Sequence, residues 1–203
     1  MKIKLTKGEL KRQRGALRQY RRYLPTLQLK KQQLQIEIIH QTLIAEQKRL
    51  DQAAKQQAAE VWAGLLAEPE VNLGPWIKPK EVLRGLRNIA GINVPVFKQA
   101  EFNLAEYDLF IMPLWVEAAI KALREIVSLS AEIRIFEEAT AILRSELRIT
   151  TQRVNLFEKV KIPEAEEAIR QIKIYIGDQI ANAVGRSKIA KRKIEELILQ
   201  GVA

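Results

Sequence analysis

The sequence predicts a mostly α-helical fold, in which two long helices pair as an antiparallel coiled coil around a small central region. Five of the seven prolines lie within residues 69–113, with Gly74, Gly85 and Gly91. The flanking stretches, roughly 5–66 and 114–199, consist largely of residues that favour helices. The expected segments are an N-terminal coiled-coil helix (1–66), a central turn-rich region with a β-hairpin (67–113), and a C-terminal coiled-coil helix (114–203) kinked near Pro163.

The C-terminal helical segment carries a heptad repeat. Its a and d positions are Ile126, Leu129, Ile133, Phe136, Thr140, Leu143, Leu147, Thr150, Val154 and Phe157. Eight of these ten residues are apolar and the other two are Thr. Such a repeat predicts a seam packed against a second helix. The repeat ends at Pro163, where the helix must kink or restart.

The same segment carries a second apolar row. This row consists of Ile135, Ile142, Ile149 and Leu156. In a helix it lies roughly a quarter turn from the d positions. Two interpretations stay open: the row widens the buried stripe of the helix pair, or it forms a second face that binds a partner protein.

The N-terminal helical segment changes the phase of its apolar residues along its length. Leu10, Leu17 and Leu24 are seven residues apart, with Tyr20 and Leu27 between or after them. The apolar positions then shift to Ile36, Ile39, Leu43 and Leu50. This segment is expected to fold back on the C-terminal helical segment as an antiparallel hairpin.

The central region contains a short alternation of apolar residues. Ile92, Val94 and Val96 alternate with polar residues or proline, and a second run starts at Ala100. This pattern predicts a β-hairpin that turns near Lys98 and Gln99. Trp76 and Trp115 flank the region. We expect both to be core residues of a small cap.

Basic residues are concentrated at one end of the chain. Residues 1–31 contain 11 Lys and Arg against Glu9 alone, which accounts for the whole net charge of +10. A second basic cluster near the C-terminus consists of Arg186, Lys188, Lys191, Arg192 and Lys193. This distribution favours acidic partners, such as an acidic protein cavity, nucleic acid or anionic lipid.

The residues that enzymes most often use are scarce. The chain has no Cys and one His, His40, which excludes disulfides, thiolate sites and sites with two imidazoles. It has no glycine-rich phosphate loop followed by Lys-Ser or Lys-Thr, and no nucleophile elbow. No stretch approaches the ~20 apolar residues of a membrane span. We therefore expect no catalytic, cofactor-binding or metal-binding residues, and no enzymatic activity of the chain itself.

Three segments resemble a known family. The stretch LKRQRGALRQYRRYLPTLQLKK (10–31) is similar to the first helix of the D subunits of V/A-type ATPases, and TQRVNLFEKVKIPEAEEAIRQIKIYI (151–176) resembles that family's RVNALE…IP segment. Tyr107-Asp108-Leu109-Phe110, followed by Pro113-Leu114-Trp115, resembles its divergent bacterial branch. The resemblance covers nearly the whole chain.

The resemblance implies a central-stalk rotor protein. Such a rotor transmits torque between ATP hydrolysis or synthesis in a catalytic hexamer of A and B subunits and ion translocation by a membrane ring. The small F subunit of the stalk and a subunit that links to the ring are the other implied partners. The nucleotides belong to A and B, so no cofactor and no direct nucleotide binding are expected. The implied location is the cytoplasmic, inner face of the cell membrane, reached only through the complex.

The rotor interpretation assigns two sets of contact residues. Exposed basic side chains can make weak, exchangeable contacts with an acidic sleeve. The candidates for this bearing are Arg12, Arg14, Arg18, Arg21, Arg22, Arg186, Lys188, Lys191, Arg192 and Lys193. The candidate face for the F subunit is the second apolar row, Ile135, Ile142, Ile149 and Leu156.

Two other classes of protein remain as alternatives to the rotor. A basic coiled-coil scaffold or nucleic-acid-binding protein would use the same basic end, but the only aromatic residues there are Tyr20 and Tyr23, and no base-reading motif is present. A lipid-bound helix would need anchoring residues, and residues 1–31 contain no Trp or Phe.

Overall fold

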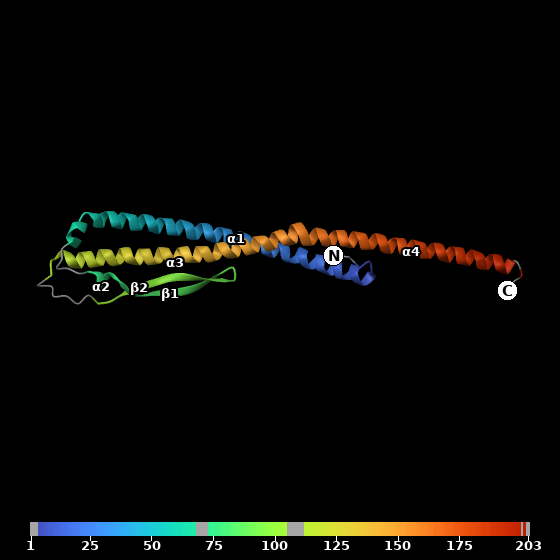
Figure 1. The fold of residues 1–203 in the computed structure, drawn as a ribbon, viewed down its shortest axis with the longest axis horizontal. Helices are drawn as coiled ribbons and strands as arrows, with labels where there is room; N and C mark the ends of the chain where they lie inside the picture. Colours follow the sequence, from blue (N-terminus) through green and yellow to red (C-terminus); the bar gives the residue numbers. More distant parts are fainter. Residues whose placement is uncertain (1–3, 68–72, 105–111, 200, 202–203) are drawn as a thin grey trace. The chain divides into compact units, whose positions relative to one another are not determined.

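The computed structural model describes residues 4–67, 73–104, 112–199 and 201. It contains α1 (Lys7–Glu60), a 3₁₀ turn (Ala63–Ala67), the short α2 (Gly74–Ile77), strands β1 (Pro79–Ile89) and β2 (Ile92–Phe102), α3 (Trp115–Leu156), a π-helix (Phe157–Lys161) and α4 (Ile162–Leu199). The chain is thus mostly helical, with one antiparallel hairpin near its middle (Figure 1). This confirms the predicted fold class.

The chain forms two compact units, and each contains parts of both long helical segments. One unit comprises Met1–Leu29 with Thr151–Ala203, and the other comprises Lys30–Thr150. We call them the terminal unit and the hairpin unit. Each is described here by itself.

In the hairpin unit, α1 and α3 run antiparallel. Ion pairs join Lys30 to Glu146 at 3.6 Å and Lys48 to Glu132 at 3.1 Å, so positions that advance along α1 meet positions that recede along α3. The predicted α3 heptad positions are all buried or half-buried. Leu143 is fully buried and Ile133 is 7% exposed. The expected seam of the helix pair is therefore confirmed for α3.

The α1 side of this seam is less apolar than the α3 side. Its buried and half-buried residues recur at intervals of four and three, which is a coiled-coil repeat. We call them the inner seam: Leu34, Ile38, Gln41, Ala45, Lys48 and Gln52. Half of these positions are polar, so the inner seam does not follow the most apolar spacing of the helix. Their polar groups find partners: Gln41 donates to Glu37 at 2.8 Å and Gln52 to Ser130 at 2.9 Å.

The hairpin β1–β2 lies along α3 in the same unit (Figure 1). Val94 on β2 is 1% exposed and packs with Leu34, Ala139 and Leu143. An exposed ion pair between Arg84 and Glu138, at 3.0 Å, adds a second contact with α3. The hairpin is thus covered on one side by the helix pair, which supplies the hydrophobic surface that an isolated two-stranded sheet lacks.

The hairpin turns at Ala90 and Gly91, and the predicted turn at Lys98 and Gln99 was wrong. Residues 92–102 form a single strand, in which Pro95 is tolerated because a two-stranded sheet has only edge strands. Both turn residues have positive φ angles, 50° for Ala90 and 81° for Gly91. The Asn88 side chain accepts a hydrogen bond from the Gly91 N–H at 3.1 Å. Ala before Gly is a weak sequence signal for such a turn.

We expect Ala90→Asn to stabilise the hairpin unit by about 0.5–1 kcal/mol, because Asn tolerates a positive φ angle better than Ala does. Urea unfolding followed by circular dichroism measures this change. Ala90→Val is the matched control, and it should destabilise the unit because a β-branched residue disfavours a positive φ angle. Equal unfolding midpoints for the Asn variant and the parent would contradict the strain at this turn.

Near the α2 end of the hairpin unit, aromatic residues form a second cluster. Leu73, Val116, Ala119 and Ile120 are buried, and Trp62, Trp76, Ile77, Trp115 and Leu123 pack against them. The prediction that Trp76 and Trp115 belong to a small core is therefore confirmed. This cluster joins the end of α1 to α2 and the start of α3.

In the terminal unit, the N-terminal part of α1 packs against the end of α3 and the first half of α4. Tyr20 stacks on Phe157, with ring centroids 5.4 Å apart, and Arg21 pairs with Glu166 at 2.5 Å. Val154 and Ile172 are almost completely buried. Pro25 lies inside α1 and does not end it.

Candidate functional site

The candidate functional surfaces are exposed faces of helices. In the hairpin unit, α1 carries a row of large apolar side chains that point away from the inner seam. We call this row the outer stripe: Ile36, Ile39, Leu43 and Leu50. Their exposed fractions are 68%, 61%, 65% and 65%. The structure places these four residues on the side of the helix opposite the inner seam.

The outer stripe has the spacing of a helix-binding seam. Ile36, Leu43 and Leu50 are seven residues apart, and Ile39 lies between the first two, as in an a/d repeat. On this part of α1 four large apolar residues face solvent, while Gln41, Lys48 and Gln52 share the inner seam with Leu34, Ile38 and Ala45. An isolated helix pair gains no stability from apolar side chains that face solvent. Exposed apolar rows of this kind usually mark interaction surfaces.

A groove lies beside the outer stripe. It has a volume of about 450 Å³ and is lined by Gln33, Ile36, Glu37, Ile89 and Ala90. Ile36, a residue of the outer stripe, therefore lies close to the tip of the hairpin. A partner helix seated on the stripe would meet the hairpin turn at this point.

The second apolar row of α3 does not form one exposed face. Ile135 is 2% exposed, and Ile142 packs on the cluster around Leu34, Val94 and Leu143. Ile149 is half-buried, whereas Leu156 is 44% exposed. The hairpin and the helix pair thus cover much of the row, so only Leu156 and part of Ile149 stay accessible to a partner.

We therefore expect the double change Ile142→Asp, Ile149→Asp to destabilise the hairpin unit by more than about 2 kcal/mol, because an unpaired carboxylate would enter the cluster around Leu143. Thermal unfolding followed by circular dichroism measures this loss. Leu156→Asp, at an exposed position, is the control and should unfold close to the parent. An unchanged midpoint for the double variant would mean that Ile142 is not part of the core.

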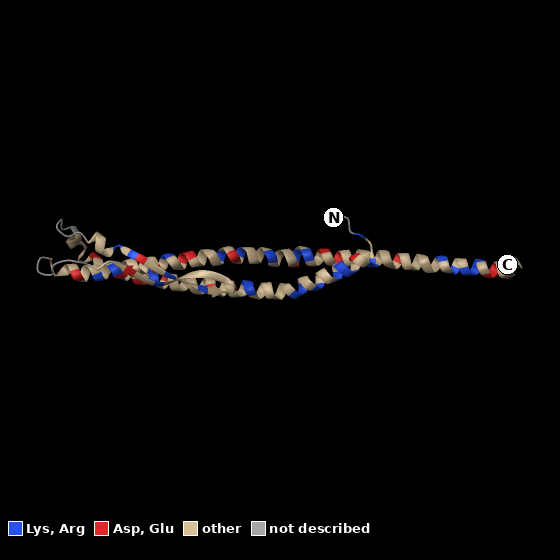
Figure 2. Ribbon diagram, turned by 90° about the horizontal axis from the view of Figure 1, so that it is seen from below, with Lys and Arg blue, Asp and Glu red and all other residues tan. Residues whose placement is uncertain are grey.

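The predicted bearing residues are all exposed in the terminal unit. Figure 2 shows Lys and Arg along the N-terminal part of α1 and near the C-terminal end of α4. Several of them make only local or surface ion pairs: Arg12 with Glu9 at 2.8 Å, and Arg192 with Glu196 at 3.2 Å. Such pairs exchange readily with other carboxylates because they are solvated.

Two surface carboxylates of the terminal unit, Glu9 and Glu167, have lowered pKa values. Hydrogen bonds from Arg170, and secondarily from Gln171, lower the pKa of Glu167 to about 2. A hydrogen bond from Arg12 is the largest cause that lowers the pKa of Glu9. Because the pKa is lowered in the folded chain, each pairing stabilises the fold at pH values above the ordinary pKa of 4.5. This stabilisation is lost as the pH falls through the lowered pKa. Near neutral pH these two carboxylates are therefore ionised and paired with Arg12 and Arg170.

Sequence reasoning missed an apolar face on α4 beside the C-terminal basic cluster. Beyond Ile172, which is fully buried, Ile180, Val184 and Ile194 are 50–58% exposed. A shallow groove of about 380 Å³ is lined by Ile180, Ala183, Val184, Ser187, Lys188 and Lys191. The apolar spacing of three and four residues in 172–194 could have revealed this face. It continues the side of α4 that carries the buried Ile172, so exposed apolar residues lie beside the C-terminal basic cluster.

Comparisons with known proteins identify the family. The sequence model of the ATP synthase D subunit matches residues 9–192. The V-type ATP synthase D subunit of Borreliella burgdorferi is 42% identical over 193 residues, which cover 95% of each chain. Those of Chlamydia pneumoniae and Chlamydia caviae are 31% and 33% identical, over 96% of this chain and 94% of theirs. The chain belongs to the family of ATP synthase D subunits.

In this member of the family, the segment that carries the resemblance contains an irregular turn of helix. The residues from Arg153 to Pro163 span the end of α3, the π-helix and the start of α4. The Ile162 N–H donates to the Phe157 carbonyl, five residues back, and Pro163 has no N–H to donate. Stacking of Tyr20 on Phe157 fixes this turn against α1. The predicted kink at Pro163 is thus a π-turn inside an otherwise continuous helical segment.

Within the described part of the chain, no helix is both long enough and apolar enough to cross a bilayer.

Proposed function

We propose that the chain is the central-stalk rotor of a V-type ATP synthase, which transmits torque between a catalytic hexamer and an ion-translocating membrane ring. Membership of the family of D subunits across residues 9–192 carries this proposal. The paired helices of both units support it, because two helices packed along a seam resist twisting better than one helix does.

The catalytic A and B subunits are the proposed partners of the terminal unit. The basic segment 1–31 and the C-terminal basic cluster offer charges that can pair transiently with acidic walls. Ile180 and Val184 add an apolar face on the part of α4 that extends past its buried segment. The chain itself is proposed to be non-catalytic, with nucleotides bound by A and B.

The small F subunit of the stalk is the proposed partner of the outer stripe in the hairpin unit. The seven-residue spacing of Ile36, Leu43 and Leu50 fits a helix of the partner, which would form a second seam on the side of α1 opposite α3. This assignment moves the main contact from the second apolar row of α3 to α1. Leu156 and Ile149, which stay partly accessible, are retained as secondary candidates.

A further subunit is proposed to link the chain to the membrane ring. The whole assembly would then place this chain on the inner face of the cell membrane without a membrane-spanning segment of its own. Its role in ATP synthesis and ion transport follows from that assembly.

An affinity purification from native membranes tests the proposed function. The chain, carrying a cleavable tag, is expressed at native level, and the membranes are solubilised in mild detergent. The expected result is stoichiometric recovery of a catalytic A/B pair together with ATPase activity. A tagged chain that is recovered alone, or with nucleic acid that resists nuclease and salt, would overturn the proposal. An unrelated tagged coiled-coil protein of similar charge is the control.

A further inference from the structure

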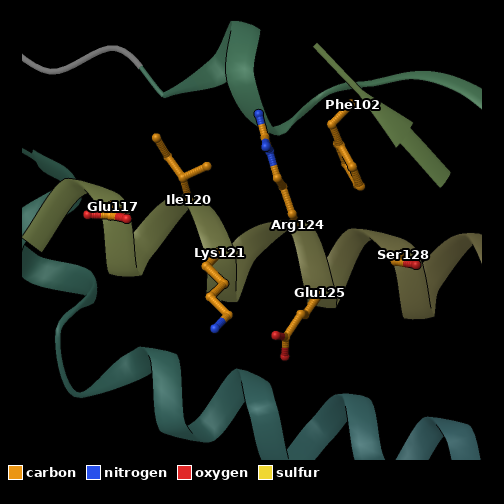
Figure 3. A pocket seen from close by; sticks show the side chains of 7 residues that line it. All are labelled: Phe102, Glu117, Ile120, Lys121, Arg124, Glu125 and Ser128. Atoms are coloured by element: carbon orange, nitrogen blue, oxygen red, sulfur yellow. The ribbon is translucent and has the colours of Figure 1, made fainter. Parts of the chain in front are cut away.

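Arg124 on α3 binds two separate segments of the hairpin unit at once. Its Nε–H donates to the carbonyl oxygen of Trp76, on α2, at 2.9 Å. One of its terminal nitrogens, Nη2, donates to the carbonyl oxygen of Asn103, just after β2, at 2.6 Å. Its guanidinium carbon lies 5.3 Å from the centre of the Phe102 ring. Figure 3 shows the side chain reaching from α3 toward α2, with Phe102 beside it.

These contacts use properties that only Arg combines. The planar guanidinium carries donors in a fixed fork, so one group can bond to two carbonyls from different segments while its face rests against an aromatic ring. Arg124 is half-buried, and an open cavity of about 470 Å³ lies alongside it. A Lys at this position would offer a single ammonium, which could not reproduce both bonds with the same geometry.

The surroundings explain why this connection matters mechanically. α2 is only four residues long and lacks a side-chain hydrogen bond at its N-cap. β2 ends at Phe102, one residue before the second carbonyl that Arg124 binds. The other polar connection from the hairpin to α3 that the described residues show, Arg84 with Glu138, is about half exposed at both ends. Exposed ion pairs of this kind contribute little to stability.

We propose that Arg124 is a positioning residue that fixes α2 and the end of β2 on α3, and that torque transmission depends on this connection. The proposal rests on the rotor function proposed above. Without the Arg124 bonds, α2 would stay on α3 only through the apolar contacts of its aromatic cluster, and the end of β2 would lose a polar connection to α3. A partner bound to these segments would then pass less of its rotation to the helix pair.

The experiment compares Arg124→Met with Arg84→Met in the complete complex reconstituted into vesicles. Met keeps an unbranched apolar stem like that of Arg but lacks the guanidinium and its donors. ATP hydrolysis and the ATP-driven membrane potential are recorded with a voltage-sensitive dye, which reports pumping of either H⁺ or Na⁺. For Arg124→Met, we expect complex assembly and ATP hydrolysis within about twofold of the parent, and a severalfold lower potential per ATP hydrolysed. Arg84→Met should couple as the parent does.

Hydrogen exchange on the same complexes reads the position of α2 directly. The Ile77 and Lys78 amides donate to Leu73 and Gly74 within α2. Their exchange should become roughly tenfold faster in Arg124→Met, and Arg124→Lys should lie between that variant and the parent. Unchanged exchange would overturn the positioning role, and faster exchange with normal coupling would overturn the mechanical role. Equal pumping by complexes assembled with and without this chain would instead refute the rotor function.

Discussion

Replacing Ile36 and Leu43 with Asp should abolish binding of the small F subunit of the stalk while leaving the chain folded. Both side chains are about two-thirds exposed in the isolated chain, so their loss removes little of its own core. Covering an apolar side chain of this size contributes roughly 1.5–3 kcal/mol. Loss of two such contacts would weaken binding by about 3–6 kcal/mol, which is on the order of 100-fold or more.

The measurement is a titration of the purified F subunit into the chain by calorimetry, with circular dichroism as the test of folding. Thr42→Asp is a matched control, because this exposed residue is next to Leu43 in the chain but points about 100° away around the helix. It should bind the F subunit as the parent does. Normal affinity of the double variant would contradict the assignment of the outer stripe to this partner.

The opposite side of the same helix should respond in the opposite way. Leu34 is fully buried against Val94, Ala139 and Leu143, only two residues from Ile36. Leu34→Ala should cost about 2–5 kcal/mol of the stability of the hairpin unit, because it leaves a cavity in that cluster. Binding and folding are thus expected to separate between two faces of α1. A variant pair that behaves identically would mean that the two faces are not distinct.

The contrast between these faces explains what the sequence could and could not predict. The α3 seam is apolar at nearly every heptad position, so its register could be identified from spacing alone. On α1 half of the inner seam is polar (Gln41, Lys48 and Gln52), whereas the outer stripe of the same stretch is wholly apolar. A rule that places apolar residues inside therefore selects the wrong face. Helices that bind on two sides carry two superimposed patterns, and only the packing shows which one is internal.

Local backbone chemistry accounts for the misplaced hairpin turn. The turn at Ala90 and Gly91 has one residue that suits positive φ angles and one that does not. Lys98 and Gln99 form a polar break after Val96 and Phe97, which is the stronger turn signal in the sequence. In the folded hairpin these two residues lie on an exposed side of β2, and Gln99 pairs with Leu83 near an irregularity in the register. The turn was therefore misplaced for two reasons: the true turn has a weak sequence signal, and the strand contains an irregular polar segment that resembles a turn.

The candidate site was only partly accessible to sequence reasoning for a similar reason. Composition located the basic segment 1–31 and the C-terminal basic cluster, since charge is visible without a fold. The connection made by Arg124 depends on backbone carbonyls of Trp76 and Asn103, which are distant in sequence and carry no side-chain signal. No pattern of residue types predicts such a contact.

The largest functional effect is expected from the basic segment of α1. Changing Arg12, Arg14, Arg18, Arg21 and Arg22 to Gln together should leave helix content nearly unchanged. These residues are exposed, and the ion pair of Arg21 with Glu166 is about half exposed at both ends. Five exchangeable contacts of about 0.2–1 kcal/mol each add up to about 1–5 kcal/mol, which is at least roughly fivefold in affinity for the catalytic hexamer. ATP-driven pumping by the reconstituted complex should therefore be strongly impaired.

A charge-matched variant separates the position of these residues from their number. The control changes the same number of exposed basic residues in the hairpin unit, Lys80, Lys98, Arg87, Arg134 and Arg144, to Gln. Both variants carry the same net charge, so a general electrostatic effect would impair both equally. A bearing formed by α1 predicts that only the first variant loses assembly with A and B, and that its defect resembles that of the parent at high salt, where exchangeable ion pairs are screened. If the first variant pumps normally at low salt, the basic segment is not a bearing, and the apolar face of α4 around Ile180 and Val184 must hold the chain in the hexamer.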